Sequence, residues 1–174
     1  MSSTYGEKIK VSLFGQSHSA AVGVVIDGFP AGVQIDFDKL QSFLNRRAAR
    51  GEISTSRQEP DIPEFLSGFT GNTTCGAPIS AIIRNTNVRS GDYKGLSNTP
   101  RPSHADYAVG SKFGSFADFS GGGHLSGRLT AALCIAGGIC KQYLESVGIT
   151  VGAHIYAIAG IKDQPFDPVN IDKD

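Results

Sequence analysis

Polar and apolar side chains near the start of the chain follow the patterns of β-strands. Residues 8–14 (KIKVSLF) alternate between polar and apolar, as in a strand with one buried face. Residues 22–27 (VGVVID) are almost wholly apolar and predict a more deeply buried strand. A glycine-bounded turn over residues 15–19 (GQSHS) separates them, and two shorter strands are expected at residues 64–68 and 79–84.

Helical patterns account for three segments further along the chain. Asp36 or Asp38 is expected to cap a helix that runs to about Arg47. Residues 104–116 predict a second helix, and residues 126–147 a third, in which apolar side chains recur with the helical period. The third helix is the clearest element of the sequence.

The remaining segments are connections and one strand. Gly148 is placed to stop the third helix, whereas the adjacent glycines at 137–138 lie inside it and favour a close approach of another backbone. Residues 48–63 are loop-like, and residues 85–103 form a long polar stretch without a clear period, which predicts a long loop that is either functional or disordered. Residues 150–161 predict a final strand.

Composition limits the class of protein. With 174 residues, 40% hydrophobic and 18% charged, the chain is not disordered and suits one domain or a large piece of one. Its 16 basic and 16 acidic side chains give no net charge, which argues against a nucleic-acid or membrane-surface partner. No apolar run approaches the roughly 20 residues that span a bilayer, and no signal peptide opens the chain, so a cytoplasmic location is expected. The three cysteines show no zinc-ligand spacing, and no metal site is predicted.

Positive charge is concentrated in the middle of the chain. Seven of the eight arginines lie within residues 46–101, where they favour recognition of a carboxylate or phosphate group. For Arg46, Arg47, Arg50 and Arg57 the alternative is a solvated helix end, at which cations complement the helix dipole.

Two histidines lie in settings that suit proton transfer. His18 lies in a glycine-bounded turn from which its imidazole can project into a cleft, and the alternative is a histidine that caps its own turn. In residues 101–107 (RPSHADY), Ser103 is expected to cap the second helix and His104 to lie in its first turn, beside the anion-binding Arg101. The alternative there is that both side chains only satisfy free backbone amides.

A glycine-rich segment precedes the third helix. In residues 121–128 (GGGHLSGR) three glycines can form a concavity of backbone amides, with the helix N-terminus behind it and Arg128 in the first turn. That arrangement fits a phosphate-bearing ligand, and the alternative is a flexible hinge into a core helix. The residues alone therefore predict a cleft for a small, multiply anionic molecule with proton transfer available, or a non-catalytic anion- or nucleotide-binding module.

Taken in order, these segments resemble chorismate synthase. The seven matching blocks are residues 14–32, the pair Arg46 and Arg47, and residues 54–61, 66–79, 85–93, 101–114 and 121–138. Three blocks depart from forms common in the family: GQSHS stands where GESHG is common, RPSHAD where RPGHAD is common, and HLSGRLT in place of RSSARET. The last difference removes an arginine.

The resemblance implies a fold, a reaction and an assembly. The implied fold is an α/β (α+β) layered β-α-β sandwich, with helices packed between antiparallel or mixed sheets. The implied reaction is the trans-1,4-elimination of phosphate from 5-enolpyruvylshikimate 3-phosphate to give chorismate, the last common step of the shikimate pathway to the aromatic amino acids, and it requires reduced FMN. Members of the family are homotetramers.

The resemblance also implies roles for the matched residues. His18 would protonate or stabilise the departing phosphate, and His104 would lie by the flavin ring and stabilise its reduced, anionic form. The residues implied to hold the substrate are Ser17, Arg47, Arg101 and Arg128, with Arg46, Arg50 and Arg57 as secondary candidates. Those implied to lie along the FMN are His124, Leu125 and Ser126. Arg47 is also the implied NADP contact, in members that have an NADPH-dependent flavin reductase activity.

Family members have longer chains than this one. Their C-terminal half brings further FMN-binding segments and the residues implicated in removing the substrate proton. We therefore expect residues 1–174 to be the N-terminal portion of a single chorismate synthase domain, without turnover by itself.

Overall fold

The computed structural model describes residues 3–48, 59–86, 99–164, 167 and 169, and its centre is a five-stranded antiparallel sheet. In spatial order the strands are β1 (Thr4–Tyr5), β2 (Lys10–Gly15), β3 (Ala21–Asp27), β7 (Ile79–Arg84) and β4 (Glu64–Ser67). A small hairpin between β4 and β7 consists of β5 (Phe69–Thr70) and β6 (Thr73–Thr74). The four strands expected in the first half of the chain are confirmed.

β3 is the most buried strand of the large sheet. It pairs with β2 on one side and β7 on the other, so that Val24 lies opposite Leu13 and Ala81. Val22, Val24 and Ile26 are fully buried, because alternate side chains of a strand point to the same face. Two helices cover that face.

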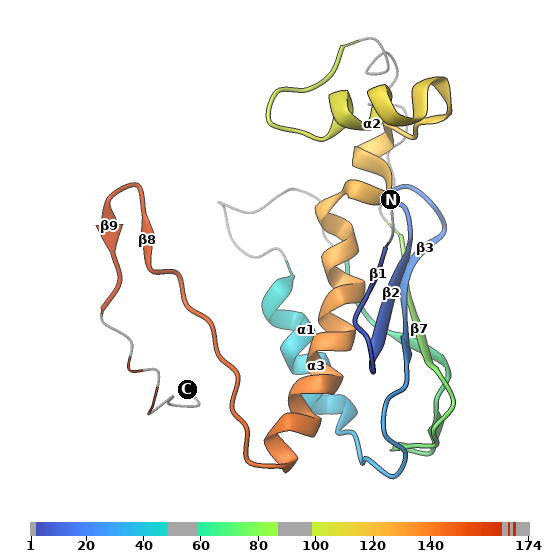
Figure 1. Cartoon of the computed structure of the whole chain (residues 1–174), viewed down its shortest axis with the longest axis vertical. Helices are drawn as coiled ribbons and strands as arrows, with labels where there is room; N and C mark the ends of the chain where they lie inside the picture. The colour runs from blue at the N-terminus through green and yellow to red at the C-terminus, as the bar shows by residue number, and fades with distance from the viewer. Residues whose placement is uncertain (1–2, 49–58, 87–98, 165–166, 168, 170–174) are drawn as a thin grey trace.

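These helices lie side by side along one face of the sheet (Figure 1). They are α1 (Phe37–Arg47) and α3 (Thr130–Ser146). The largest side chains that they bury in the core are Leu40, Leu44, Ile135 and Ile139. The carboxylate of Asp36 accepts a hydrogen bond from the Lys39 amide at 2.9 Å, so Asp36 rather than Asp38 caps α1.

The two helices approach one another at a glycine. A Cβ atom at Gly138 would lie 2.4 Å from Cδ1 of Leu40 and 3.1 Å from Cδ1 of Phe43. The neighbouring Gly137 is exposed, and a Cβ there would meet nothing within 4 Å. The expected close approach therefore holds for Gly138 alone, and side chains of α1 rather than its backbone make it.

The second expected helix begins later than predicted. α2 (Asp106–Phe113) lies across one end of the layers and is followed by the 3-10 turn η3 (Gly114–Phe116) (Figure 1). The prediction that Ser103 caps this helix, with His104 in its first turn, is wrong: Ala105 occupies the N-cap position and no side chain caps it. Ser103 has a φ of 60°, so the chain makes a left-handed turn before the helix starts.

The third helix was expected over residues 126–147, whereas α3 begins only at Thr130. Two 3-10 turns, η4 (Ser120–Leu125) and η5 (Gly127–Leu129), precede α3. The Ser126 hydroxyl accepts a hydrogen bond from the Arg128 amide and so caps η5. The stop at Gly148 is confirmed, since its φ is 82° and its amide donates to the Glu145 carbonyl at 3.1 Å.

The prediction of one strand over residues 150–161 is wrong. The chain instead forms a two-stranded hairpin, β8 (Ala157–Ile158) and β9 (Ile161–Lys162), that stands apart from the large sheet (Figure 1). Ala159 and Gly160 both have positive φ, as in the tightest hairpin turns. The chain therefore reverses where the apolar pattern predicted an extended strand.

The fold class is α/β, with antiparallel sheets and packed helices, as expected. Within the described ranges, no helix is long and apolar enough to cross a membrane. The expected loops at residues 48–63 and 85–103 fall largely on residues 49–58 and 87–98, which are outside the described residues.

The adjacent glycines of α3 give a prediction about stability. Gly137→Ala should raise the free energy of unfolding by about 0.5–1 kcal/mol, because alanine restricts the unfolded chain and meets no neighbour. Gly138→Ala should lower it by about 1 kcal/mol or more, because the new methyl group overlaps Leu40. Urea unfolding of both variants measures the difference, and equal stabilisation by the two would contradict the packing described above.

Candidate functional site

Two glycines of the η4 turn hold the two candidate catalytic histidines. A Cβ at Gly121 would lie 2.2 Å from Cε1 of His18 and 2.9 Å from Oγ of Ser17. A Cβ at Gly122 would lie 2.9 Å from both Cε1 and Nε2 of His104 and 3.5 Å from Cβ of Ser126. Since consecutive Cα atoms are about 3.8 Å apart, both imidazoles pack against the same short piece of backbone.

The backbone of this turn explains why its residues are glycines. Gly121, Gly122 and Gly123 have φ values of 58°, 99° and 55°, a region that residues with a Cβ rarely adopt. The Gly123 carbonyl accepts a hydrogen bond from the Ser17 amide at 3.0 Å, which joins the turn to the β2–β3 connection. The glycine-rich segment is thus a point of close approach for side chains, and its predicted role as a phosphate cradle stays a prediction.

The turn that carries His18 is closed by another residue. The Ser19 hydroxyl accepts from the Gln16 amide at 2.9 Å and lies 2.8 Å from the Ala21 carbonyl. Ser19 thus caps this turn, and the alternative considered for His18, a cap of its own turn, stays open. Its ring is half-buried and faces the glycine turn, next to the buried Ser17.

His104 is held by a buried carboxylate. Its Nδ1 lies 2.6 Å from Oδ1 of Asp106, whose side chain is 2% exposed. Arg101 donates to the same carboxylate through Nε at 2.7 Å, Nη2 at 2.9 Å and its backbone amide at 3.0 Å. The His104 ring thus contacts a carboxylate, so the alternative that it only satisfies backbone amides is wrong.

The charge of Asp106 decides which ring nitrogen of His104 carries a proton. Hydrogen bonds from Arg101 hold the pKa of Asp106 well below its usual value, so the carboxylate is ionised and can only accept. The proton between the two groups is therefore on Nδ1 of His104, and Nε2 faces Gly122.

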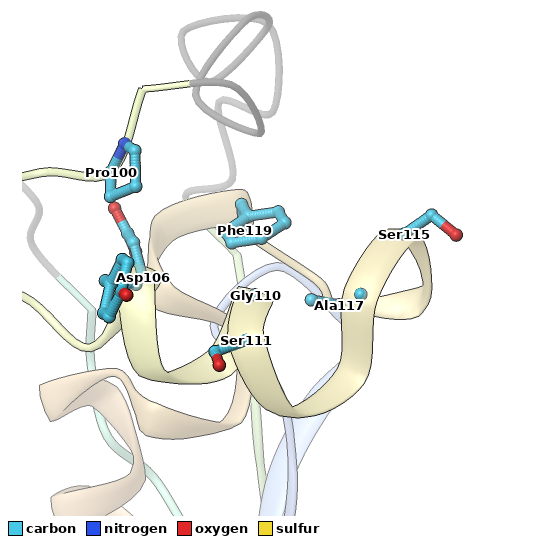
Figure 2. A pocket seen from close by; sticks show the side chains of 9 residues that line it. Pro100, Asp106, Gly110, Ser111, Ser115, Ala117 and Phe119 are labelled. Carbon is cyan, nitrogen blue, oxygen red and sulfur yellow. The ribbon is translucent and has the colours of Figure 1, made fainter.

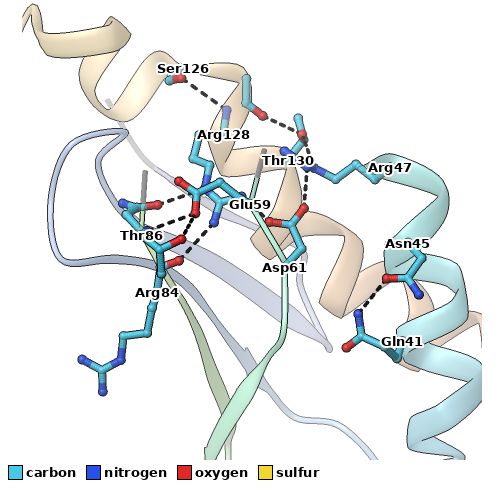
Figure 3. Close-up of polar contacts among 12 residues, drawn as sticks. Gln41, Asn45, Arg47, Glu59, Asp61, Arg84, Thr86, Ser126, Arg128 and Thr130 are labelled. Carbon is cyan, nitrogen blue, oxygen red and sulfur yellow. Dashed lines mark hydrogen bonds and ion pairs between the residues drawn. The ribbon is translucent and has the colours of Figure 1, made fainter. Parts of the chain in front are cut away.

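A second cluster joins two of the predicted substrate arginines. Figure 3 shows the Asp61 carboxylate between Arg47 of α1 and Arg128 of η5. Nη1 of Arg47 lies 2.6 Å from Oδ2, and Nη1 of Arg128 donates to Oδ1. Asp61 is 1% exposed and has a φ of 46°. Nε of Arg47 also donates to the Thr130 hydroxyl at 3.1 Å.

Asn85 links this cluster to the His18 turn. Its amide oxygen accepts from Nε of Arg128 at 2.9 Å, and its Nδ2 donates to the carbonyls of Gln16 and Ser19 at 3.1 and 2.7 Å. The backbone amide of Arg128 also donates a hydrogen bond to the hydroxyl of Ser126. Ser126 lies beside Gly122, against which the His104 ring packs. The predicted residues Ser17, His18, Arg47, Arg101, His104, Ser126 and Arg128 thus belong to one connected set.

Two of the three residues expected along the FMN are engaged by the protein itself. Nδ1 of His124 donates to the Gly15 carbonyl at 2.7 Å, and its Nε2 lies 2.6 Å from the Ser3 hydroxyl. The Ser126 hydroxyl accepts from the Arg128 amide. Leu125 is 37% exposed and offers an apolar surface beside the glycine turn.

Of the three secondary arginine candidates, Arg46 alone lies in the described part of the chain, and it does not join the cluster. Arg46 is exposed, and its guanidinium carbon lies 6.0 Å from the centre of the Phe43 ring, as on a solvated helix face. Arg50 and Arg57 are outside the described residues.

An open hollow of about 710 Å³ adjoins the His104 cluster. Figure 2 shows it over α2, with Asp106 and Pro100 at one side and Phe119 across from them. Neither His18 nor His104 is among its lining residues, so the hollow reaches the His104 cluster only at Asp106 and does not surround the imidazoles.

Sequence reasoning missed three residues that organise the site. Asp61, Asn85 and Asp106 each lie inside a block that matched the family, yet none was proposed for a role. The available signal was chemical: each buried arginine needs a carboxylate or amide partner, but Asp61 and Asn85 lie 67 and 43 residues from Arg128, so only Asp106, five residues from Arg101, could have been found by proximity in the sequence.

Comparisons with known proteins identify the family. The family model described as chorismate synthase matches residues 9–173. The chain belongs to the chorismate synthase family. Chorismate synthases of Lancefieldella parvula and Christiangramia forsetii are 46% and 48% identical to it over 95% and 83% of its length. That of Thermococcus kodakarensis is 42% identical over 90%.

A solved chorismate synthase has the same fold. It covers 83% of this chain with a TM-score of 0.58 and 25% sequence identity. The chain spans less than half the length of these relatives: 44%, 41% and 44% of the three above, and 36% of the solved chain.

The close approach of His18 to the glycine turn can be tested by substitution. Gly121→Ala should displace the His18 ring and lower the free energy of unfolding by about 1–3 kcal/mol, because the methyl group overlaps the imidazole at a left-handed φ. Gly127→Ala is the matched control, since a Cβ there meets nothing within 4 Å. Urea unfolding and the His18 ring signals in NMR spectra measure both effects; an unmoved His18 in the stable Gly121→Ala protein would refute the contact.

The Asp106 carboxylate predicts a pH dependence of stability. Its folded pKa lies below the usual 3.8, so the stabilisation is present above that value and is lost as the pH falls below it. Asp106→Asn should therefore lower the free energy of unfolding by about 1.5–3 kcal/mol at neutral pH. The gap between the two proteins should narrow below about pH 4. A gap that stays constant down to acid pH would contradict this.

Proposed function

We propose that this chain forms part of a chorismate synthase active site that eliminates phosphate from 5-enolpyruvylshikimate 3-phosphate to give chorismate. Membership of the family supports the proposal, and so does one observation from the structure: His18 and His104 pack against adjacent glycines beside an arginine cluster. A homotetramer in the cytoplasm, with neither nucleic acid nor membrane as partner, belongs to the same proposal.

The chemistry requires charge to be neutralised at the leaving group. In a 1,4-elimination the C–O bond to phosphate breaks, a proton leaves from a ring carbon, and a second ring double bond forms. Negative charge grows on the departing phosphate, so nearby cations and proton donors lower the barrier. His18 is our candidate to protonate or hydrogen-bond that oxygen, with the Ser17 hydroxyl beside it.

His104 has a different proposed role, because its ring is anchored. With Nδ1 held by Asp106, the ring keeps one orientation and can carry a positive charge while Nε2 faces the glycine turn. Such a group stabilises an anion placed on its Nε2 side. Arg101, bound to the same carboxylate, adds a second positive charge close to it.

The residues that we describe fit one part of reduced FMN. Leu125, which is exposed, offers an apolar contact for a flat ring, whereas His124 and Ser126 have their polar atoms engaged. When bound, the reduced flavin supplies electron density that eases C–O cleavage. His104 would then compensate negative charge on the ring, and Arg47 stays the candidate for a contact to NADP.

Turnover tests the two histidines. In a chimera of this chain with the C-terminal portion of the Lancefieldella parvula relative, His18→Ala and His104→Ala should each lower chorismate formation at least about tenfold, since general acid-base groups contribute roughly 10²–10⁴. The assay uses 5-enolpyruvylshikimate 3-phosphate and dithionite-reduced FMN without oxygen. His154→Ala, in the exposed region near Asp163, is the matched control.

The same chimera separates catalysis from simple binding. If both histidine variants turn over at the wild-type rate, the proposed catalytic roles are refuted. If no variant turns over but all bind 5-enolpyruvylshikimate 3-phosphate equally in calorimetry, the segment is an anion-binding module without these catalytic groups.

A further inference from the structure

We infer that Asp61 is a positioning residue that aligns Arg47 and Arg128 for the anionic group of the substrate, an inference that rests on the proposed function. Asp61 need not touch the ligand in this role. It acts through the two guanidinium groups that it holds, one on each carboxylate oxygen.

The geometry supports a positioning role because the carboxylate is shared. Arg47 comes from the end of α1 and Arg128 from η5, so without a shared anion these two cations would repel one another. The side chain of Asp61 is 1% exposed, that of Arg128 5%, and that of Arg47 23%. A buried ion pair stabilises a fold poorly unless its geometry is good, and here both oxygens are used.

The charges leave room for one more anion. At the Asp61 carboxylate itself, two described guanidinium groups share one carboxylate, so this contact carries an excess positive charge. Arg47 is the more exposed of the two cations, so this charge is accessible from its side. A phosphate or carboxylate group of a ligand would complete the balance.

The remaining contacts fix the directions of the two arginines. Nε of Arg47 is bound by Thr130, and Nε of Arg128 by Asn85. With Asp61, the Arg47 guanidinium is held at two points and that of Arg128 at three, since its Nη2 also donates to the Arg84 carbonyl at 3.4 Å. These contacts restrict the rotation of both groups. Asp61 supplies the point that both share, and its left-handed backbone, with a φ of 46°, turns the carboxylate into the space between them.

Replacement of Asp61 by asparagine distinguishes two effects of Asp61 on anion binding: its orientation of the arginines and its negative charge. The amide is the same size and adopts the same φ, but its NH2 group cannot accept a hydrogen bond from an arginine. Asp61→Asn raises the local charge, so electrostatics alone predicts tighter binding of inorganic phosphate. Positioning predicts the opposite, a dissociation constant raised about tenfold, the order expected when a charge-assisted hydrogen bond to the ligand is lost.

The titration of inorganic phosphate into the 174-residue chain at low salt decides between these outcomes. The control is Glu64→Gln, which removes an equal charge and breaks an exposed pair with Arg84 without touching Asp61, and it should leave the affinity unchanged. An affinity for phosphate that is unchanged or higher in Asp61→Asn overturns the inference.

A second measurement needs no ligand, and its first part needs no variant. The Nη1 protons of Arg47 and Arg128, whose hydrogen bonds Asp61 accepts, should exchange with water more slowly than those of the exposed Arg46 in NMR spectra of the wild-type chain, and Asp61→Asn should accelerate this exchange. Exchange in the wild type as fast as that of Arg46 overturns the inference even if the variant does not fold. If exchange is slow and inorganic phosphate binds as expected but 5-enolpyruvylshikimate 3-phosphate does not bind, the proposed function fails while the alignment of the two arginines by Asp61 for an anion stands.

Discussion

The Asp61 carboxylate lies out of solvent between Arg47 and Arg128, and three separate parts of the chain meet at this contact. The end of α1, the segment before β4 and the turn before α3 each bring one charged group. Removal of the carboxylate would leave two cations close together and partly buried, a state that typically costs several kcal/mol. The same contact that joins the segments therefore also keeps a positive charge near the candidate active site.

The glycine turn imposes the second constraint, which is steric. Gly121 and Gly122 let two imidazoles approach the backbone more closely than any Cβ allows. The two constraints are linked, because Asn85 connects Arg128 to the turn that carries His18, and Ser126 connects the amide of Arg128 to the neighbourhood of Gly122. The two clusters are thus joined by polar contacts, through Asn85 on one side and Ser126 on the other.

The sequence pattern predicted the elements whose burial is periodic and failed where local geometry depends on a distant partner. β3 and α3 bury one side at a regular interval, and both were expected within a few residues. His104 was expected in a helix, yet the contacts of Asp106 with Arg101 keep the preceding residues in a turn. The proposed roles of His18 and His104 were predicted from motifs shared with the family. Asp61 also lies in a shared block, but that block predicted no role for it. Its importance follows only from burial, and burial is a property of the folded chain.

Backbone strain is concentrated around the same residues. Three described residues other than glycine have positive φ, and two of them, Asp61 and Ser103, lie in the segments that position Arg47 and His104. Such conformations cost of order 1–3 kcal/mol each and persist only where surrounding contacts hold them. At Asp61 two arginines provide those contacts; near Ser103 the contacts are the four bonds that Asp106 accepts from Arg101 and His104. In both clusters a buried carboxylate is the group that offsets the strain, so each one orients the positively charged side chains and maintains the backbone from which they project.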